Sequence, residues 1–176
     1  MKRDDRHIIK EVLNGKSREF EHILNKYSQQ VFNLVVNIVS SKEDAEELTQ
    51  DVFLKAFQSL SLFKEESSFS TWLYRIATNE TYTFVSKNSH VQYDDIDEAA
   101  TAIEADEWFD GDHLQARLQA AIQSLPPKQR MVFNMKYYDE MKYEEMSAIL
   151  GTSTGALKAS YHIAVKKISE YLERDN

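Results

Sequence analysis

Apolar residues recur at helical spacing along most of the chain. Four of them in the first thirty residues are spaced at i, i+3, i+4 and i+7: Phe20, Ile23, Leu24 and Tyr27. This spacing places side chains on one face of an α-helix. The stripe continues in phase, so we predict one long helix over residues 18–39. A shorter stripe before it ends at Gly15, which we expect to cap its helix.

The stretch over residues 40–60 has the clearest helix start. Ser41 can accept a hydrogen bond from the first turn. Acidic residues at positions 43, 44, 46 and 47 suit the positive end of the helix dipole. The apolar residues expected to face the core are Ala45, Leu48, Val52 and the run from Leu54 to Phe57.

The sequence FSTWLYRIATNETYTF, residues 69–84, predicts a further helix. It follows a serine-rich loop over residues 63–70, and Ser70 or Thr71 is the expected N-cap. One stripe should face the helical bundle: Leu73, Ile76, Ala77 and Phe84. An adjoining stripe should lie at the rim of the bundle, beside the loop: Trp72, Arg75, Asn79 and Tyr82.

The last third of the chain predicts four more helices. The first ends at the Pro126-Pro127 pair, and the second covers about residues 128–138. The third covers residues 143–150, and the fourth begins after Ser153 and runs to about residue 172. A short helix, a glycine-containing turn and a longer helix form a helix-turn-helix. The exposed side of the last helix should present Lys158, Ser160, His162, Lys166 and Lys167.

Composition and charge favour an all-α fold with two small helical domains. Only 4 Gly and 2 Pro occur in 176 residues, which suits long helices. Residues 91–112 contain nine acidic residues and no Lys or Arg, so most of the net charge of −8 lies there. We therefore expect domains over residues 1–90 and 113–176, joined by an acidic linker over residues 91–112. The linker is either a solvated tether or a weak helix around residues 99–108.

Several classes of function are not expected. The chain has no Cys, so disulfides, thiol nucleophiles and cysteine-ligated zinc are excluded. The five His residues share no ligand spacing, and no phosphate-binding loop or catalytic motif is present. We expect no enzymatic activity, no cofactor and no metal. The N-terminus lacks an apolar signal core and no apolar run is long enough to span a membrane, so we expect a cytoplasmic protein.

Three surfaces carry candidate chemistry. In the last helix, donors can meet guanine or other base edges (Lys158, Ser160, His162) or phosphates (Ser153, Thr154, Lys166). The alternative is an ordinary hairpin with a solvated basic face. Aromatic and hydroxyl side chains between residues 63 and 79 can hold unstacked bases, although Phe69 and Trp72 can also be simply core. The acidic face over residues 43–51 is either solvated or docks a partner.

Three segments in order resemble the bacterial sigma-70 family, specifically its extracytoplasmic-function (ECF, group IV) RNA polymerase sigma factors. DAEELTQDVFLKAFQSLSLF resembles region 2.2, and FSTWLYRIATNET resembles the junction of regions 2.3 and 2.4. The stretch LQAAIQSLPPKQRMVFNMKYYDEMKYEEMSAILGTSTGALKASYHIAVKKISEYL resembles region 4. With the N-terminal helices, the resemblance covers the chain outside the acidic linker.

The resemblance implies three sets of contacts. Core RNA polymerase, through the clamp coiled coil of its β′ subunit, would be bound by Asp44, Glu47, Leu48, Gln50, Asp51 and Phe53. The −10 element, with a flipped non-template base, would be bound by Phe63, Ser67, Ser68, Phe69, Trp72, Arg75 and Asn79. The −35 element would be bound as duplex by Ser153, Thr154, Lys158, Ser160, His162 and Lys166. The other side of region 4 would meet the β flap, and an anti-sigma factor is an expected partner.

Two departures from the family pattern limit what can be transferred. Few basic residues follow the region 2.4 helix, and Ala159, Ile163 and Val165 stand where many relatives have polar or basic residues. The sequence therefore implies no particular promoter. One alternative is a sigma-like decoy that binds an anti-sigma factor without recognising a promoter. Another is a dimeric helix-turn-helix repressor, although that leaves residues 67–79 unexplained.

Overall fold

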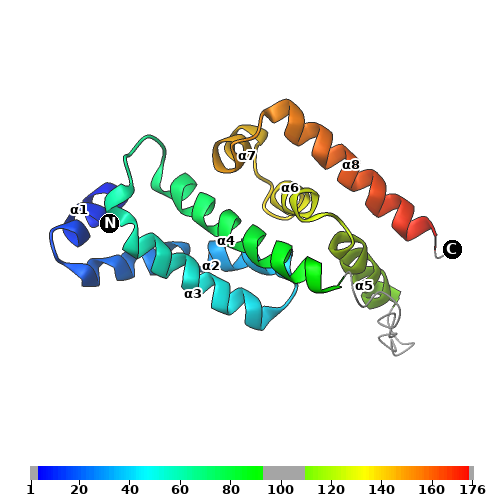
Figure 1. The fold of residues 1–176 in the computed structure, drawn as a ribbon, viewed down its shortest axis with the longest axis horizontal. Helices are drawn as coiled ribbons and strands as arrows, with labels where there is room; N and C mark the ends of the chain where they lie inside the picture. The colour runs from blue at the N-terminus through cyan, green and yellow to red at the C-terminus, as the bar shows by residue number, and fades with distance from the viewer. Residues whose placement is uncertain (1–3, 93–109, 175–176) are drawn as a thin grey trace.

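The protein is helical throughout the part of the chain that the structure describes. The computed structural model describes residues 4–92 and 110–174, and these ranges contain no strand. The helices are α1 (Asp5–Leu13), α2 (Phe20–Val39), α3 (Lys42–Gln58), α4 (Phe69–Gln92), α5 (Asp110–Gln123), α6 (Pro127–Tyr137), α7 (Tyr143–Leu150) and α8 (Thr154–Glu173) (Figure 1). Short 3-10 turns precede α2 (Ser17–Glu19) and follow α3 (Leu60–Leu62). The all-α prediction is confirmed, and the weak helix proposed around residues 99–108 lies outside the described residues.

Capping side chains set several of the helix starts. Ser41 Oγ accepts a hydrogen bond from the Asp44 amide at 3.2 Å, as expected for the start of α3. Ser153 Oγ accepts from the Ala156 amide at 3.2 Å and starts α8. The prediction of Ser70 or Thr71 as the cap of α4 was wrong. The helix begins earlier, at Phe69, and Ser68 Oγ accepts from the Thr71 amide at 3.2 Å.

Helices α1 to α4 form one unit, which we call the N-terminal bundle. Side chains with no exposed surface come from three of its helices: Ile23, Val31 and Val35 of α2, Ala45, Val52 and Ala56 of α3, and Leu73, Ala77 and Thr81 of α4. Two members of the bundle-facing stripe predicted for α4, Leu73 and Ala77, are thus confirmed, whereas Ile76 and Phe84 are only half-buried. The expectation that Leu54 and Phe57 face the core was wrong, because they are 56% and 40% exposed. Leu54 points about 200° around the helix from Val52, so α3 cannot bury both.

Helices α5 to α8 form a second unit, the C-terminal module. Ile122, Leu125, Phe133, Ala164 and Ile168 pack together in a core formed by α5, α6 and α8. Helices α7 and α8 make the predicted helix-turn-helix, and Gly151 adopts a φ of +67° at the end of α7. This left-handed conformation is strained for other L-residues, which explains the glycine in the turn.

The two units pack directly against each other, which the sequence did not reveal. Met131, Met135 and Met146 of the C-terminal module belong to the same apolar cluster as the core of the N-terminal bundle. In Figure 1 helix α4 lies between α2 and α3 on one side and α6 and α7 on the other. Apolar burial of this kind stabilises a contact between domains.

Polar side chains also join the two units, and they do so at helix C-termini. Asn134 Nδ2 donates to the Asn37 carbonyl at 2.8 Å, and a guanidinium nitrogen of Arg130 donates to the Ile38 carbonyl at 3.3 Å. These carbonyls belong to the last turn of α2, which has no intrahelical donors for them. In the opposite direction, Arg75 Nε donates to the Ala148 carbonyl near the end of α7 at 2.7 Å. Each unit therefore caps a helix of the other.

Candidate protein-binding and nucleic-acid interfaces

Helix α3 presents an acidic and amide-bearing face to solvent. Glu47, Gln50 and Asp51 are exposed, and Asp44 is half-buried beside the Ser41 cap. Leu48 and Phe53, which we grouped with them, are buried in the core of the bundle. The polar members are therefore available to a partner, while the two apolar members hold the helix that displays them.

An open apolar groove of about 400 Å³ adjoins this face. It lies between α2 and α3 and is lined by Phe20, Leu24, Ser28, Thr49, Gln50, Phe53, Leu54 and Phe57. Gln50 belongs both to the groove and to the acidic face. Sequence reasoning missed the groove because it assigned Leu54 and Phe57 to the core. The signal was present, since apolar residues at 52, 53, 54, 56 and 57 are too many for one helix face.

The loop before α4 carries a cluster of three aromatic rings. The ring centroids of Phe63 and Trp72 are 5.4 Å apart, and Phe69 lies 5.6 Å from each of them. Phe69 is only 4% exposed, so it fits the alternative of a core residue. Phe63 and Trp72 are half-buried. Direct contact of Phe69 with a base stays a prediction. In this structure the Phe69 ring packs against the rings of Phe63 and Trp72.

Hydroxyl side chains near this cluster contact one another at the start of α4. Ser68 Oγ lies 3.0 Å from Ser70 Oγ and 2.9 Å from Thr71 Oγ1, and Ser67 Oγ donates to the Ser68 carbonyl at 3.3 Å. Asn79 is exposed about two turns further along α4 from Trp72. Arg75 lies between them, but its Nε is occupied by the Ala148 carbonyl.

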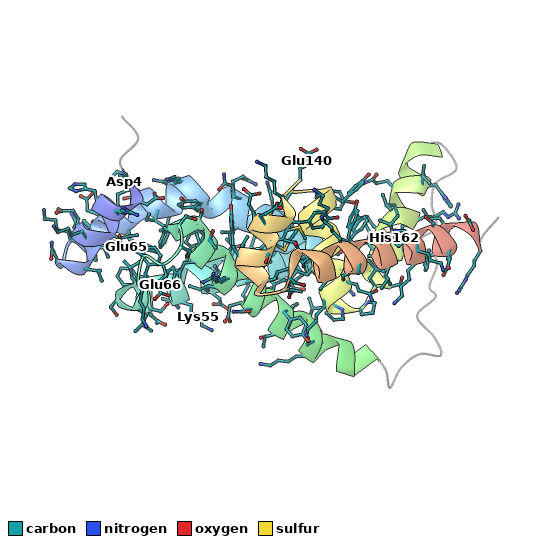
Figure 2. All side chains as sticks on the ribbon, turned by 90° about the horizontal axis from the view of Figure 1, so that it is seen from above. Asp4, Lys55, Glu65, Glu66, Glu140 and His162 are labelled. Atoms are coloured by element: carbon teal, nitrogen blue, oxygen red, sulfur yellow. The ribbon has the colours of Figure 1, made fainter. Side chains whose placement is uncertain are left out.

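The outer face of α8 carries a row of basic side chains. Lys158, His162 and Lys166 are exposed and spaced four residues apart, so they line one side of the helix; His162 is labelled in Figure 2. Lys158 Nζ lies 5.6 Å from the centroid of the Tyr143 ring, and Lys166 Nζ lies 3.9 Å from Glu170 Oε1. The row is thus exposed and only weakly paired.

The other residues predicted for this surface are placed less openly. Ser160 is half-buried and lies on the opposite side of α8 from the row of Lys158, His162 and Lys166. The Ser153 hydroxyl is used by the helix cap, and Thr154 is half-buried at the first position of α8. Amides at this helix start still face the turn, where an anion is favoured by the helix dipole.

Burial between the two units shifts three pKa values. It raises the pKa of Asp139, which follows α6, to about 6, and one oxygen of this carboxyl is buried without a hydrogen-bond partner. Burial also raises the pKa of Tyr74 of α4 to about 12, with smaller contributions from Tyr27 and Asp139. Loss of hydration lowers the pKa of the Arg130 guanidinium. The contact between the units therefore encloses ionisable groups.

Neither a metal site nor a membrane span is found among the described residues. Within residues 4–92 and 110–174, no group of three or more His, Cys, Asp or Glu side chains is arranged to hold a metal ion. None of the helices in these ranges is long and apolar enough to cross a bilayer.

The chain belongs to the sigma-70 family. Residues 23–91 match the family model of sigma-70 region 2, and residues 115–168 match that of sigma-70 region 4. Its relatives are ECF RNA polymerase sigma factors. It is 32% identical to SigW of Bacillus subtilis over 88% of this chain and 89% of that protein, and 29% identical to the sigma-E factor of Escherichia coli K12 over 88% and 87%. The ECF resemblance inferred from the sequence is confirmed.

Solved structures show the same fold. The sigma factor RpoE, in complex with the anti-sigma factor NepR from Bartonella quintana, superposes with a TM-score of 0.66 at 25% identity, covering 90% of this chain and 99% of that one. CnrH, in complex with the cytosolic domain of CnrY, gives a TM-score of 0.68 at 21% identity over 98% of this chain and 99% of that one. At that identity the second likeness concerns the fold alone.

Proposed function

We propose that this chain is a transcription initiation factor that binds core RNA polymerase and directs it to specific promoters. One observation carries the proposal: the same chain contains a sigma-70 region 2 and a sigma-70 region 4. The second helix of the helix-turn-helix in region 4 carries an exposed row of basic side chains. The chain has no enzymatic activity of its own in this account. It works in the cytoplasm, where polymerase and promoter DNA meet.

Helix α3 is the proposed docking element for polymerase. Its exposed face, with Glu47, Gln50 and Asp51, is the part of the predicted set that a partner can reach without unfolding the bundle. By family resemblance the partner surface is the β′ clamp coiled coil. Leu48 and Phe53 act indirectly, because they pack inside the bundle.

The aromatic cluster and Asn79 are the proposed −10 surface. Phe63 and Trp72 lie against each other and are half-buried, and the exposed Asn79 amide can both donate to and accept from a base. The α8 row of Lys158, His162 and Lys166 is the proposed −35 surface. Side chains of this kind donate to guanine or to phosphate in the major groove.

An anti-sigma factor is a further proposed partner. The structure of the sigma factor RpoE holds the anti-sigma factor NepR. The closed packing of region 4 on region 2 in this chain would be compatible with a partner that holds both units together. A decoy that binds only such a partner is the second candidate function.

Run-off transcription with purified core polymerase tests the proposal. The account predicts transcripts from promoter templates only when this protein is added, whereas a decoy gives none. The free protein should shift promoter DNA poorly in a gel assay, because few phosphates can be neutralised by its thin basic surface. Tight and specific DNA binding without polymerase would contradict the proposed role.

A further inference from the structure

Helix α8 carries a large apolar side chain on its outer face. Ile163 is 45% exposed, although it lies in the middle of the helix. The side of α8 that packs inward is formed by Leu157, Ala164 and Ile168, and Ile163 points away from it. A single exposed isoleucine is ordinary on a protein surface, so its neighbours decide what it means.

The neighbours of Ile163 are basic or small. Lys166 and Lys167 follow it at three and four residues, and both are exposed. His162 of the basic row is adjacent in sequence. Ile163 is therefore an apolar spot bordered by cations, on the helix that the proposed function places in the major groove.

The chemistry of base edges limits what such a spot can contact. Only thymine presents a methyl group, at C5, in the major groove; the polar atoms of the other bases there are hydrogen-bond donors and acceptors. An isoleucine held against guanine, cytosine or adenine would remove water from those polar atoms without replacing the hydrogen bonds.

We propose that Ile163 reads the methyl group of one thymine in the −35 element, and that this contact contributes to promoter choice. The inference rests on the proposed function and deepens it. The neighbouring lysines would hold the phosphates on either side, so charge complementarity brings the apolar spot to the groove. Lys167 is held near α6 by a hydrogen bond from its Nζ to Gln129 Oε1 at 3.0 Å.

The helix surface before Ile163 leaves room for close approach. One turn earlier is the exposed Ala159, and one turn earlier still is Gly155. A Cβ atom added at Gly155 would meet nothing within 4 Å, so packing inside the protein does not require a glycine there. Small side chains along this line let Ile163 reach the floor of the groove without a neighbouring side chain in the way.

The test removes single methyl groups from promoter DNA. Each thymine around the −35 position of a promoter mapped by transcript 5′ ends is replaced in turn by deoxyuridine, which lacks only the methyl. Affinity is then measured for holoenzyme reconstituted from core polymerase and the full chain. At one position the replacement should weaken binding by about four-fold, the contribution of one buried methyl-sized group.

Variants link that position to the side chain. Holoenzyme with Ile163→Ala should bind the unmodified promoter more weakly by a similar factor. It should bind the promoter with deoxyuridine at that position with the same affinity as the unmodified one. Holoenzyme with Ile163→Val should still bind the unmodified promoter more tightly than the deoxyuridine promoter. Val165→Ala is the matched control. It removes a 38% exposed apolar side chain from the same helix, about 200° around from Ile163. It should leave both the affinity and the deoxyuridine-sensitive position unchanged. Thermal unfolding followed by circular dichroism verifies that each variant is folded.

The outcomes separate this inference from the proposed function. A holoenzyme that transcribes normally but shows no deoxyuridine-sensitive position overturns the role of Ile163 alone. The same holds if the sensitivity persists in Ile163→Ala. A chain that gives no transcript with core polymerase overturns the proposed function, and the inference falls with it.

Discussion

Asp139 shows how a single residue reports the packing of the two units. Its carboxyl has a pKa raised by burial to about 6, against an ordinary value of 3.8, and one of its oxygens lacks a hydrogen-bond partner. The folded protein thus holds this proton more tightly than the unfolded chain. The contribution of Asp139 to stability therefore falls as pH rises from about 4 to about 6, and the loss is complete above that range.

We predict that Asp139→Asn raises the free energy of unfolding at pH 7 and flattens its pH dependence between pH 4 and pH 6. The gain is at most about 3 kcal/mol, because a pKa change of one unit corresponds to about 1.4 kcal/mol. Urea titrations across this pH range measure it. The control is Glu140→Gln, which neutralises the exposed neighbouring carboxylate and should leave the pH dependence as it is. An Asp139→Asn profile that matches the wild type would contradict the assignment.

Single residues also mark where reasoning from sequence stops. The caps at Ser41 and Ser153 were predictable because a side chain and an amide three residues apart decide them. The burial of Phe69 was expected only as one of two alternatives, because periodicity does not tell a rim position from a core position at the first residue of a helix. The four-residue spacing of Lys158, His162 and Lys166 was readable directly.

At the scale of elements, α3 and α4 have separate roles in this account. They pack against each other in the bundle, and the side chains of Lys55 on α3 and Glu80 on α4 form an ion pair between them. Lys55 is labelled in Figure 2. The exposed face of α3 is assigned to polymerase and the rim of α4 to DNA, so substitutions on the two helices should have different consequences.

We predict that Asn79→Ala slows promoter opening about ten-fold and leaves polymerase binding unchanged. The loss corresponds to removing one bidentate contact with a base. Opening is measured by permanganate reactivity of unpaired thymines, and polymerase binding by fluorescence anisotropy of the labelled protein.

The complementary change is Asp51→Lys on α3, which reverses a charge on the proposed docking face. It should weaken polymerase binding about ten-fold or more, since like charges across an interface are strongly disfavoured. Promoter opening should recover when polymerase is in excess. If the two variants show the same defects, the division of roles between α3 and α4 is wrong.

Most elements were predictable because their signals are local. Stripes, caps and the proline pair fixed α2, α3, α6, α7 and α8 to within a few residues. The groove between α2 and α3 was not predicted, because the run from Leu54 to Phe57 was assigned to the core together with Ala45, Leu48 and Val52. A helix face covered by a partner shows the same spacing of apolar residues in the sequence as a face buried in the protein's own core. Sequence periodicity therefore does not distinguish the two.

At the scale of the whole molecule, the contact between the units is the feature that the sequence did not reveal. Asn134 and Arg130 cap the end of α2, and Arg75 caps the end of α7. These contacts join residues that are far apart in the chain, so no local pattern encodes them. Arg75 is also a predicted DNA contact, and its Nε is free for DNA only when α7 moves away.

We predict that Asn134→Ala together with Arg75→Ala shifts the protein toward an open form. Each loss leaves a helix-end carbonyl without its donor, which costs on the order of 1 kcal/mol. The chain has no natural Cys, so Gln58→Cys and Glu173→Cys allow specific dye labelling of α3 and α8. Energy transfer between the dyes should fall in the double variant. Lys87→Ala, an exposed change on α4, serves as the control.

Core polymerase should produce the same fall in energy transfer in the wild-type chain, because region 2 and region 4 must reach two separate promoter elements. Equal transfer with and without polymerase would mean that the closed packing persists in the holoenzyme, and the proposed use of Arg75 on DNA would then fail.

This chain is proposed to give core polymerase a promoter choice that the polymerase lacks alone. Sequencing the 5′ ends of RNA made on genomic DNA by purified core polymerase, with and without the protein, tests it most directly. The account predicts new start sites that share two short conserved sequence blocks at a constant spacing, one for each unit. Start sites that are the same in both reactions would contradict it.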